Sequence, residues 1–172
     1  MPNVTTFDAL LSGMTWNGVE VVGRPVFLTY SFDSAPAASL SQSFSTAFLS
    51  TFQAFNPNGQ AVARTALQAW ADACGVTFFE VPAGQGDIRF GVYDLAKGPP
   101  DVEDSVGFAF NPLVYAYPDG AAELDLGGDI FIQVGQVNFA ALVHEIGHAL
   151  ALKHPFEGLL TLEPSADNLG IM

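Results

Sequence analysis

The chain has 172 residues, enough for one ordinary domain with a buried core, and 49% of them are hydrophobic, as in a globular protein. Its 18 acidic and 5 basic residues give a formal net charge of −13, which disfavours nucleic acids and anionic membranes as partners because both bind clustered Lys and Arg. The single cysteine excludes an intrachain disulfide, and no stretch approaches the ~20 apolar residues of a transmembrane helix.

The first half of the chain predicts one strand and two helices. Residues 26–32 (VFLTYSF) are β-branched and aromatic and predict a strand, whereas residues 40–55 carry Leu and Phe at helical spacing and predict a short helix. A longer helix is predicted at 59–74, because Gly75 stands where a left-handed C-terminal cap is expected.

The second half adds strands and one more helix. Strands are predicted at 76–81, 87–94, 107–110, 113–117 and 128–134. Asn138 is a suitable N-cap for a helix that runs to about Leu152. Because strands and helices interleave, the sequence predicts a mixed α/β domain whose last helix carries the chemistry.

All three histidines lie in one segment, HEIGHALALKH, which begins at His144 and ends at His154. His144 and His148 are four residues apart, so on a helix they lie on one face and can bind the same cation. Zinc takes imidazole nitrogens at ~2.0–2.1 Å and prefers four ligands. Glu145 lies on the helix flank, where it can act as a general base on a water molecule without binding the metal.

The HExxH pattern is short, and histidines on helices are more often solvated or hydrogen-bonded core residues than ligands. The apolar flanks favour a metal, because a buried helix needs a partner for two imidazoles and a carboxylate. If the helix continued, His154 would lie ~9 Å beyond His148 and could not share the metal. Pro155 favours a break in the helix, since the residue before a proline is disfavoured in the helical region.

The segment resembles the metzincin signature HExxHxxGxxH, and its neighbours resemble the serralysin branch. LLSGMTWNG, LTYSF, LQAWADACGVTFFEV, DIRFG, GFAF and GDIFI follow that family's order, so the resemblance covers nearly the whole chain. It implies an α/β fold of the α+β type, a twisted five-stranded mixed sheet packed on two long helices, with zinc in a cleft below an edge strand. It also implies a zinc endopeptidase that hydrolyses internal peptide bonds, with one catalytic zinc on His144, His148 and His154 and with Glu145 as the base.

The mechanism implies where substrate binds and which partners to expect. An extended substrate should follow the edge strand, which we place at 128–134, with Asp129, Ile130, Phe131 and Ile132 as its binding residues. The partners are a protein or peptide substrate and a proteinaceous inhibitor, and the sequence leaves the oligomeric state open. The resemblance implies an extracellular protein, although the N-terminus lacks the basic start and apolar run of a secretory signal peptide.

Two positions depart from the family pattern. Ala151 stands at the signature glycine; if the turn needs a positive φ, alanine costs roughly 1–2 kcal/mol, and we favour this strained turn over a helix that continues through Ala151. Met172 would be the methionine of the turn below zinc, without the family's tyrosine two residues later. We interpret residues 1–172 as one catalytic domain, from a truncated product or a minimal family member, without the rest of the family's catalytic domain or its calcium repeats.

Two alternatives remain. The departures at Ala151 and at the end of the chain favour a zinc-bound but catalytically weak or inactive binding module, whereas Glu145 argues against it because a site that only holds zinc needs no base. A calcium-binding structural domain would use Glu123, Asp125 and Asp129, whose spacing fits no EF-hand loop. Calcium is therefore expected only in a longer parent protein.

Overall fold

The computed structural model describes residues 10–16, 25–112, 115–116, 122–123 and 127–155. In chain order, the elements of this part of the protein are β1 (Phe27–Phe32), the 3-10 helix η2 (Ala38–Gln42), α1 (Thr46–Leu49), α2 (Pro57–Cys74), β2 (Thr77–Glu80), β3 (Ile88–Tyr93), the 3-10 helix η3 (Leu95–Lys97), β4 (Gly107–Ala109), β5 (Tyr115–Ala116), β6 (Ala122–Glu123), β7 (Ile130–Gln133) and α3 (Phe139–Ala149). None of the helices described is long and apolar enough to cross a bilayer.

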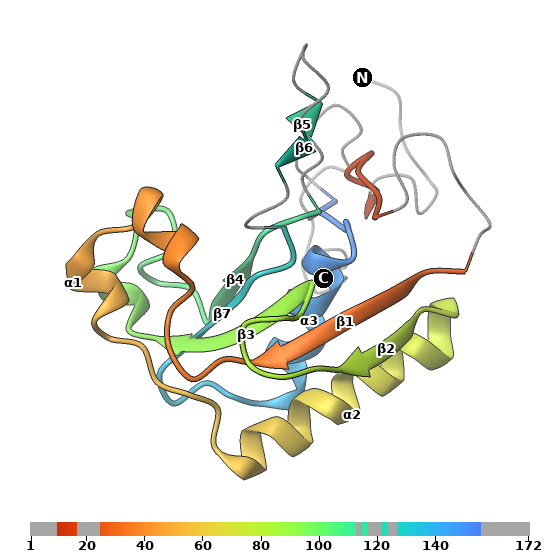
Figure 1. Ribbon diagram of the computed structural model, residues 1–172, viewed down its shortest axis with the longest axis horizontal. Coiled ribbons are helices and arrows are strands. Elements are labelled where there is room, and N and C mark those ends of the chain that lie inside the picture. Colours follow the sequence, from red (N-terminus) through yellow and green to blue (C-terminus); the bar gives the residue numbers. More distant parts are fainter. Residues whose placement is uncertain (1–9, 17–24, 113–114, 117–121, 124–126, 156–172) are drawn as a thin grey trace.

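Five strands form one mixed sheet in the order β2-β1-β3-β7-β4, and β5 pairs with β6 in a separate two-stranded sheet. The strands β2, β1, β3 and β7 run parallel, whereas β4 is antiparallel to β7. The two long helices, α2 and α3, pack against each other and against one face of the sheet (Figure 1). This is the five-stranded mixed sheet on two long helices that the family resemblance implies.

The core has two parts, one on each face of the sheet. On the helix face, Phe90 of β3 and Ile132 of β7 pack against Leu142 and Ile146 of α3, and all four side chains are buried. On the other face, Phe131 of β7 belongs to an aromatic cluster that includes residues from 40 to 48. Because the central strands β3 and β7 are covered on both faces, their position relative to α3 is tightly constrained.

The predicted strands at 26–32, 76–81, 87–94 and 107–110 and the predicted N-cap of α3 agree with the structure. The strand predicted at 113–117 does not continue the main sheet, because its described part, Tyr115–Ala116, pairs with β6 in the separate two-stranded sheet. The predicted helix at 40–55 is wrong. This segment contains the separate short helices η2 and α1. The side chain of Ser45 accepts a hydrogen bond from the backbone N–H of Phe48 and thereby starts α1 as a new helix. Serine competes for backbone hydrogen bonds, and the aromatic spacing alone does not reveal this competition.

The strand predicted at 128–134 is present as β7, but its placement at the edge of the sheet is wrong, because β7 lies between β3 and β4. Asp129, Ile130, Phe131 and Ile132 are at most 3% exposed, and the main chain of β7 pairs with a strand on each side. This strand therefore has no free edge for a substrate. The edge strand on this side of the sheet is β4, which precedes β7 in the sequence but pairs on its outer side.

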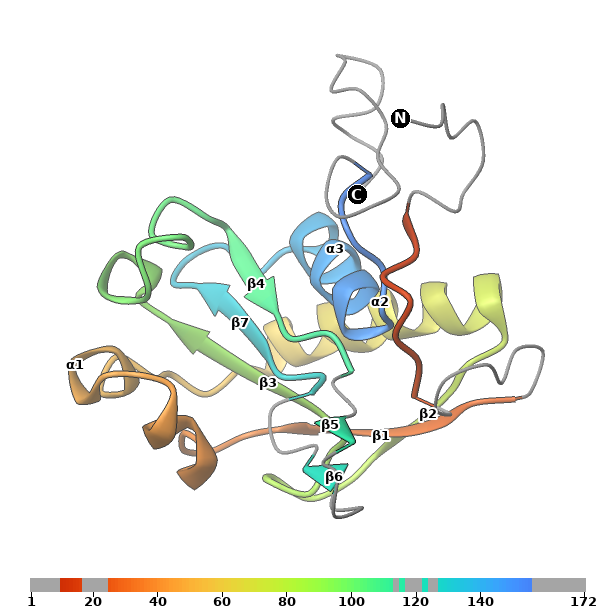
Figure 2. The same ribbon diagram turned by 90° about the horizontal axis from the view of Figure 1, so that it is seen from above.

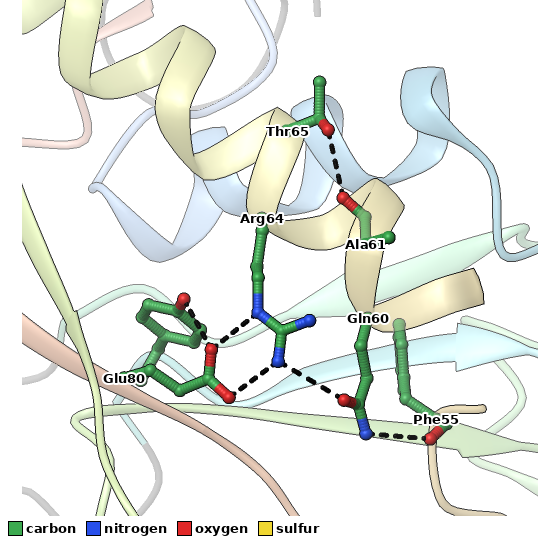
Figure 3. A network of polar contacts seen from close by, with 7 residues as sticks. Phe55, Gln60, Ala61, Arg64, Thr65 and Glu80 are labelled. Atoms are coloured by element: carbon green, nitrogen blue, oxygen red, sulfur yellow. Dashed lines mark hydrogen bonds and ion pairs between the residues drawn. The ribbon is translucent and has the colours of Figure 1, made fainter. Parts of the chain in front are cut away.

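At the far edge of the sheet, an ion pair joins α2 to β2 (Figure 3). The Arg64 guanidinium donates to both carboxylate oxygens of Glu80, from Nε at 2.6 Å and from Nη2 at 2.7 Å. These hydrogen bonds lower the pKa of Glu80. Burial, and then the hydrogen bond that Tyr30 donates to Glu80, raises the pKa of Tyr30 to about 12. Both charged side chains are about 40% exposed, so the pair contributes only ~0.2–1 kcal/mol.

Replacing Arg64 with Met should therefore destabilise the protein by up to ~1 kcal/mol at neutral pH. Because the pKa of Glu80 is lowered on folding, the contribution is present above the unfolded pKa and is lost as the pH falls through the folded pKa. The free energies of unfolding of the wild type and the variant, measured by urea unfolding at several pH values, should converge below about pH 4. A difference in the free energy of unfolding that grows as the pH falls would contradict this contribution of the ion pair. Arg64→Lys serves as the charge-retaining control.

Candidate metal centre

Helix α3 carries two of the three histidines on the flank next to its buried face. The Asn138 side chain caps the helix by accepting a hydrogen bond from the backbone N–H of Ala141 at 3.0 Å. Leu142 and Ile146 are fully buried against the sheet, which fixes the rotation of the helix about its axis. In this orientation the Nε2 atoms of His144 and His148 lie 3.1 Å apart.

The helix ends at Ala149, and a tight turn follows. The backbone N–H of Ala151 donates to the carbonyl of His148 at 2.8 Å, and that of Leu152 donates to the carbonyl of Gly147 at 2.9 Å. This pair of bonds is a Schellman motif, which needs a left-handed residue at its centre. Ala151 has a φ of 77° and is the single non-glycine residue with positive φ in the described ranges. The strained turn favoured from the sequence is therefore confirmed.

The turn brings His154 back to the other two histidines, with its Nε2 atom 3.3 Å from that of His144. One candidate ligand atom from each of the three rings lies within 4.8 Å of the others. Two nitrogens bound to one tetrahedral zinc at ~2.0–2.1 Å are about 3.3 Å apart, so the two measured separations suit a shared zinc ion. Three imidazole nitrogens are also a donor set that zinc prefers.

The ring of His148 is held by a hydrogen bond from its Nδ1 atom to the carbonyl of Leu152, at 2.9 Å. A carbonyl oxygen can only accept, so Nδ1 carries the proton and the lone pair of Nε2 is available to a metal. Metal-binding histidines commonly have such a partner on the second nitrogen, which fixes the tautomer and the orientation of the ring. The turn thus brings His154 back to the other histidines and also provides the carbonyl that orients the ring of His148.

Glu145 is 2% exposed, although a carboxylate is rarely buried without a partner. Burial raises the pKa of this carboxyl to about 8. Its Oε2 atom is buried and has no hydrogen-bond partner among the described residues. A Cβ added at Gly107 of β4 would lie 2.9 Å from both Cγ and Oε1 of Glu145, so glycine at this position makes room for the carboxylate. An orphaned buried carboxylate beside three imidazoles is typical of a reactive site.

The histidines and Glu145 line one side of an open cleft of about 470 Å³. The other side is formed by β4 and by the loop before it, including Asp101 and Val106. One edge of β4 pairs with β7, and no strand in the described part of the chain pairs with its other edge. The cleft therefore lies between an open strand edge and three convergent nitrogen donors.

Several residues singled out from the sequence do not belong to this cleft. The carboxylate of Asp129 accepts two hydrogen bonds from Arg89, at 2.6 and 2.8 Å, and this pair lies at a separate cavity. Met172, Asp125 and the side chain of Glu123 lie outside the described residues. The sequence did not predict that β4 forms a wall of the site. The local sign of this role is the glycine at 107, where the strand comes close to Glu145 of α3.

The chain is similar to proteins of a known peptidase family. The family model described as matrixin, a peptidase family, matches residues 28–162. Serralysin G of Dickeya chrysanthemi is 33% identical over 145 residues, which are 83% of this chain and 30% of that protein. Serralysin B of the same organism is 32% identical over 187 residues, covering 91% of this chain and 33% of the relative. Serralysin of Proteus mirabilis is 31% identical over 158 residues, 82% of this chain and 30% of its own length. The chain thus spans about a third of these relatives.

The positive φ of Ala151 leads to a stability prediction. Ala151→Gly should stabilise the protein by up to roughly 1–2 kcal/mol, because glycine adopts this conformation without steric cost. The matched control is Ala61→Gly on the exposed face of α2, which should cost about 0.5–1 kcal/mol. Thermal unfolding of the three proteins measures both effects. A lower midpoint for Ala151→Gly than for the wild type would show that the turn is not strained.

Proposed function

The chain belongs to the matrixin family as a serralysin-like metalloendopeptidase domain, and we propose that it hydrolyses internal peptide bonds of proteins with Glu145 as the general base. The observation that carries this proposal is the convergence of three histidine Nε2 atoms and one buried carboxylate in a single open cleft. We further propose that residues 1–172 act as one catalytic domain.

In this proposal His144, His148 and His154 hold one zinc ion. Three protein ligands leave a fourth position open, as in catalytic rather than structural zinc sites. When bound there, zinc would polarise the scissile carbonyl and acidify a water molecule next to Glu145. The hydrogen bond from His148 to the carbonyl of Leu152 orients one of the ligand rings.

Glu145 is proposed to accept a proton from the attacking water and to deliver it to the leaving amine. The carboxyl must be ionised to act as a base, and a cation on the three histidines would lower its raised pKa. Burial removes competing water from the proton-transfer path.

The substrate is proposed to be a protein or peptide in extended conformation that pairs with the open edge of β4, Gly107–Ala109, in place of the strand expected from the sequence. Main-chain hydrogen bonds to a strand edge are insensitive to side-chain identity, which suits an enzyme that cleaves many sequences. From the family resemblance we also propose that the protein acts outside the cell and that a proteinaceous inhibitor can occupy the same cleft.

A zinc-bound but inactive binding module remains the second candidate. The alanine at the signature glycine position favours it, because strain in the turn could loosen His154. The buried Glu145 opposes it, since burial of an unpaired carboxylate is costly and a site that only binds zinc has no use for it. The two candidate functions predict the same zinc content but different activity, so zinc content and peptide hydrolysis must both be measured.

Metal content is the first test. The protein purified without chelator should hold about one zinc per chain by elemental analysis, and His154→Ala should lose most of it on dialysis because one ligand is missing. Cys74→Ser is the control, since this exposed thiol is a soft zinc ligand outside the cleft. Full zinc in His154→Ala, or loss of zinc from Cys74→Ser, would contradict the proposed ligand set.

Activity is the second test. Glu145→Gln should keep its zinc while peptide hydrolysis falls by at least ~10²–10⁴, because the amide retains the shape of the side chain but cannot accept the proton. Glu103→Gln makes the same charge change at an exposed residue of the loop before β4 and should leave hydrolysis unchanged. Near wild-type turnover by Glu145→Gln would exclude Glu145 as the base, and an inactive zinc-loaded wild type would favour the binding module.

A further inference from the structure

A segment from near the start of the chain holds the turn that follows α3. This N-terminal strap, Leu10–Trp16, runs beside the end of α3 and the turn, as Figure 2 shows for the dark red and blue traces. Leu11 forms an antiparallel bridge with Leu152. The backbone N–H of Ser12 donates to the carbonyl of Ala151 at 3.1 Å, so the strap contacts the strained residue itself.

The strap also redirects the hydrogen bond that would continue the helix. In a longer α3, the backbone N–H of Lys153 would donate to the carbonyl of Ala149. Here it donates to the carbonyl of Leu10 at 2.8 Å, and the indole N–H of Trp16 donates to Ala149 instead, also at 2.8 Å. The strap thus supplies both replacement partners for the helical bond, one residue before His154.

The position of the Trp16 indole is fixed by its surroundings. The ring packs against the helix-face core. It lies so close to Gly128 that an added Cβ would be 2.9 Å from two of its ring carbons, Cζ2 and Cη2. Gly128 has a φ of 85°, a conformation that side chains rarely adopt. The indole is therefore closely packed between the loop before β7 and the end of α3, where glycine at 128 leaves room for it.

We propose that Trp16 is a positioning residue for the metal site: its indole N–H replaces the helical donor of Ala149 and thereby holds His154 in the geometry that binds zinc. The inference rests on the proposed zinc site. A purely structural role would lower the stability of the whole domain equally with and without metal. If Trp16 is instead a positioning residue, loss of its indole donor should weaken metal affinity more than it lowers the stability of the metal-free domain. The reason is that the carbonyl of Ala149 can recover a donor by drawing Lys153, and with it His154, back toward the helix.

The test compares two tryptophans. Trp16→Phe keeps a ring but removes the donor, and Trp70→Phe removes a similar indole donor, 2.9 Å from the carbonyl of Val143, away from the turn. Zinc dissociation constants of the 172-residue chains are measured by chelator competition, and metal-free midpoints by thermal unfolding. Trp16→Phe should bind zinc ~10-fold or more weakly, as expected for partners that orient a ligand, with an altered absorption spectrum of the cobalt form. Trp70→Phe should lower the midpoint while keeping wild-type zinc affinity.

A second variant covers the case in which Trp16→Phe does not fold. Ser12→Pro removes the strap's backbone donor to Ala151, at a partly exposed position, and should weaken zinc binding severalfold. It also removes the hydroxyl that accepts a hydrogen bond from the backbone N–H of Met14, so Ser12→Ala, which removes only this hydroxyl, is its control and should keep wild-type zinc affinity. Wild-type zinc affinity in a folded Trp16→Phe protein, or in Ser12→Pro where Trp16→Phe is unfolded, would overturn the positioning role and leave the proposed zinc site intact. A wild-type chain that binds no zinc would overturn the proposed function itself.

Discussion

The reversal of the chain between His148 and His154 is the constraint on which the site depends. If the helix continued to His154, these two side chains would lie ~9 Å apart along its axis, too far to share one ion. The Schellman turn at Ala151 ends the helix, returns His154 to His144 and offers the carbonyl of Leu152 to the second ring nitrogen of His148. A backbone strain of roughly 1–2 kcal/mol is small beside the ~10–16 kcal/mol of structural zinc binding in small domains. Alanine is therefore tolerated where glycine is the easier residue.

The sheet completes the site from the opposite side. Parallel strands buried on both faces fix α3, and the antiparallel strand β4 then lies directly over Glu145, with glycine at 107 as the point of closest approach. This arrangement buries the carboxylate while β4 keeps one edge open to the cleft. The same packing thus raises the pKa of the proposed base and presents a strand edge to which a peptide can pair.

Local patterns in the sequence predicted local structure well. The Asn138 cap, the left-handed Gly75, the spacing of the histidines and the strain at Ala151 depend on residues close in sequence, and the structure agrees with the pattern at each of them. The order of strands is a different problem. Nothing in the residues of β4 and β7 states that the earlier strand pairs outside the later one, so the edge was assigned to the wrong strand. The contact of Trp16 with Ala149 spans 133 positions and could not be inferred from spacing.

Two histidines on one helix and a third beyond a strained turn are proposed to share one zinc ion. A crystal structure of the zinc-loaded chain, with anomalous data collected on both sides of the zinc absorption edge, tests it most directly. We predict one anomalous peak at ~2.0–2.1 Å from the Nε2 atoms of His144, His148 and His154, with Ala151 still at positive φ. A peak bound by only two of these rings, with His154 turned away or the helix continued through Ala151, would contradict it.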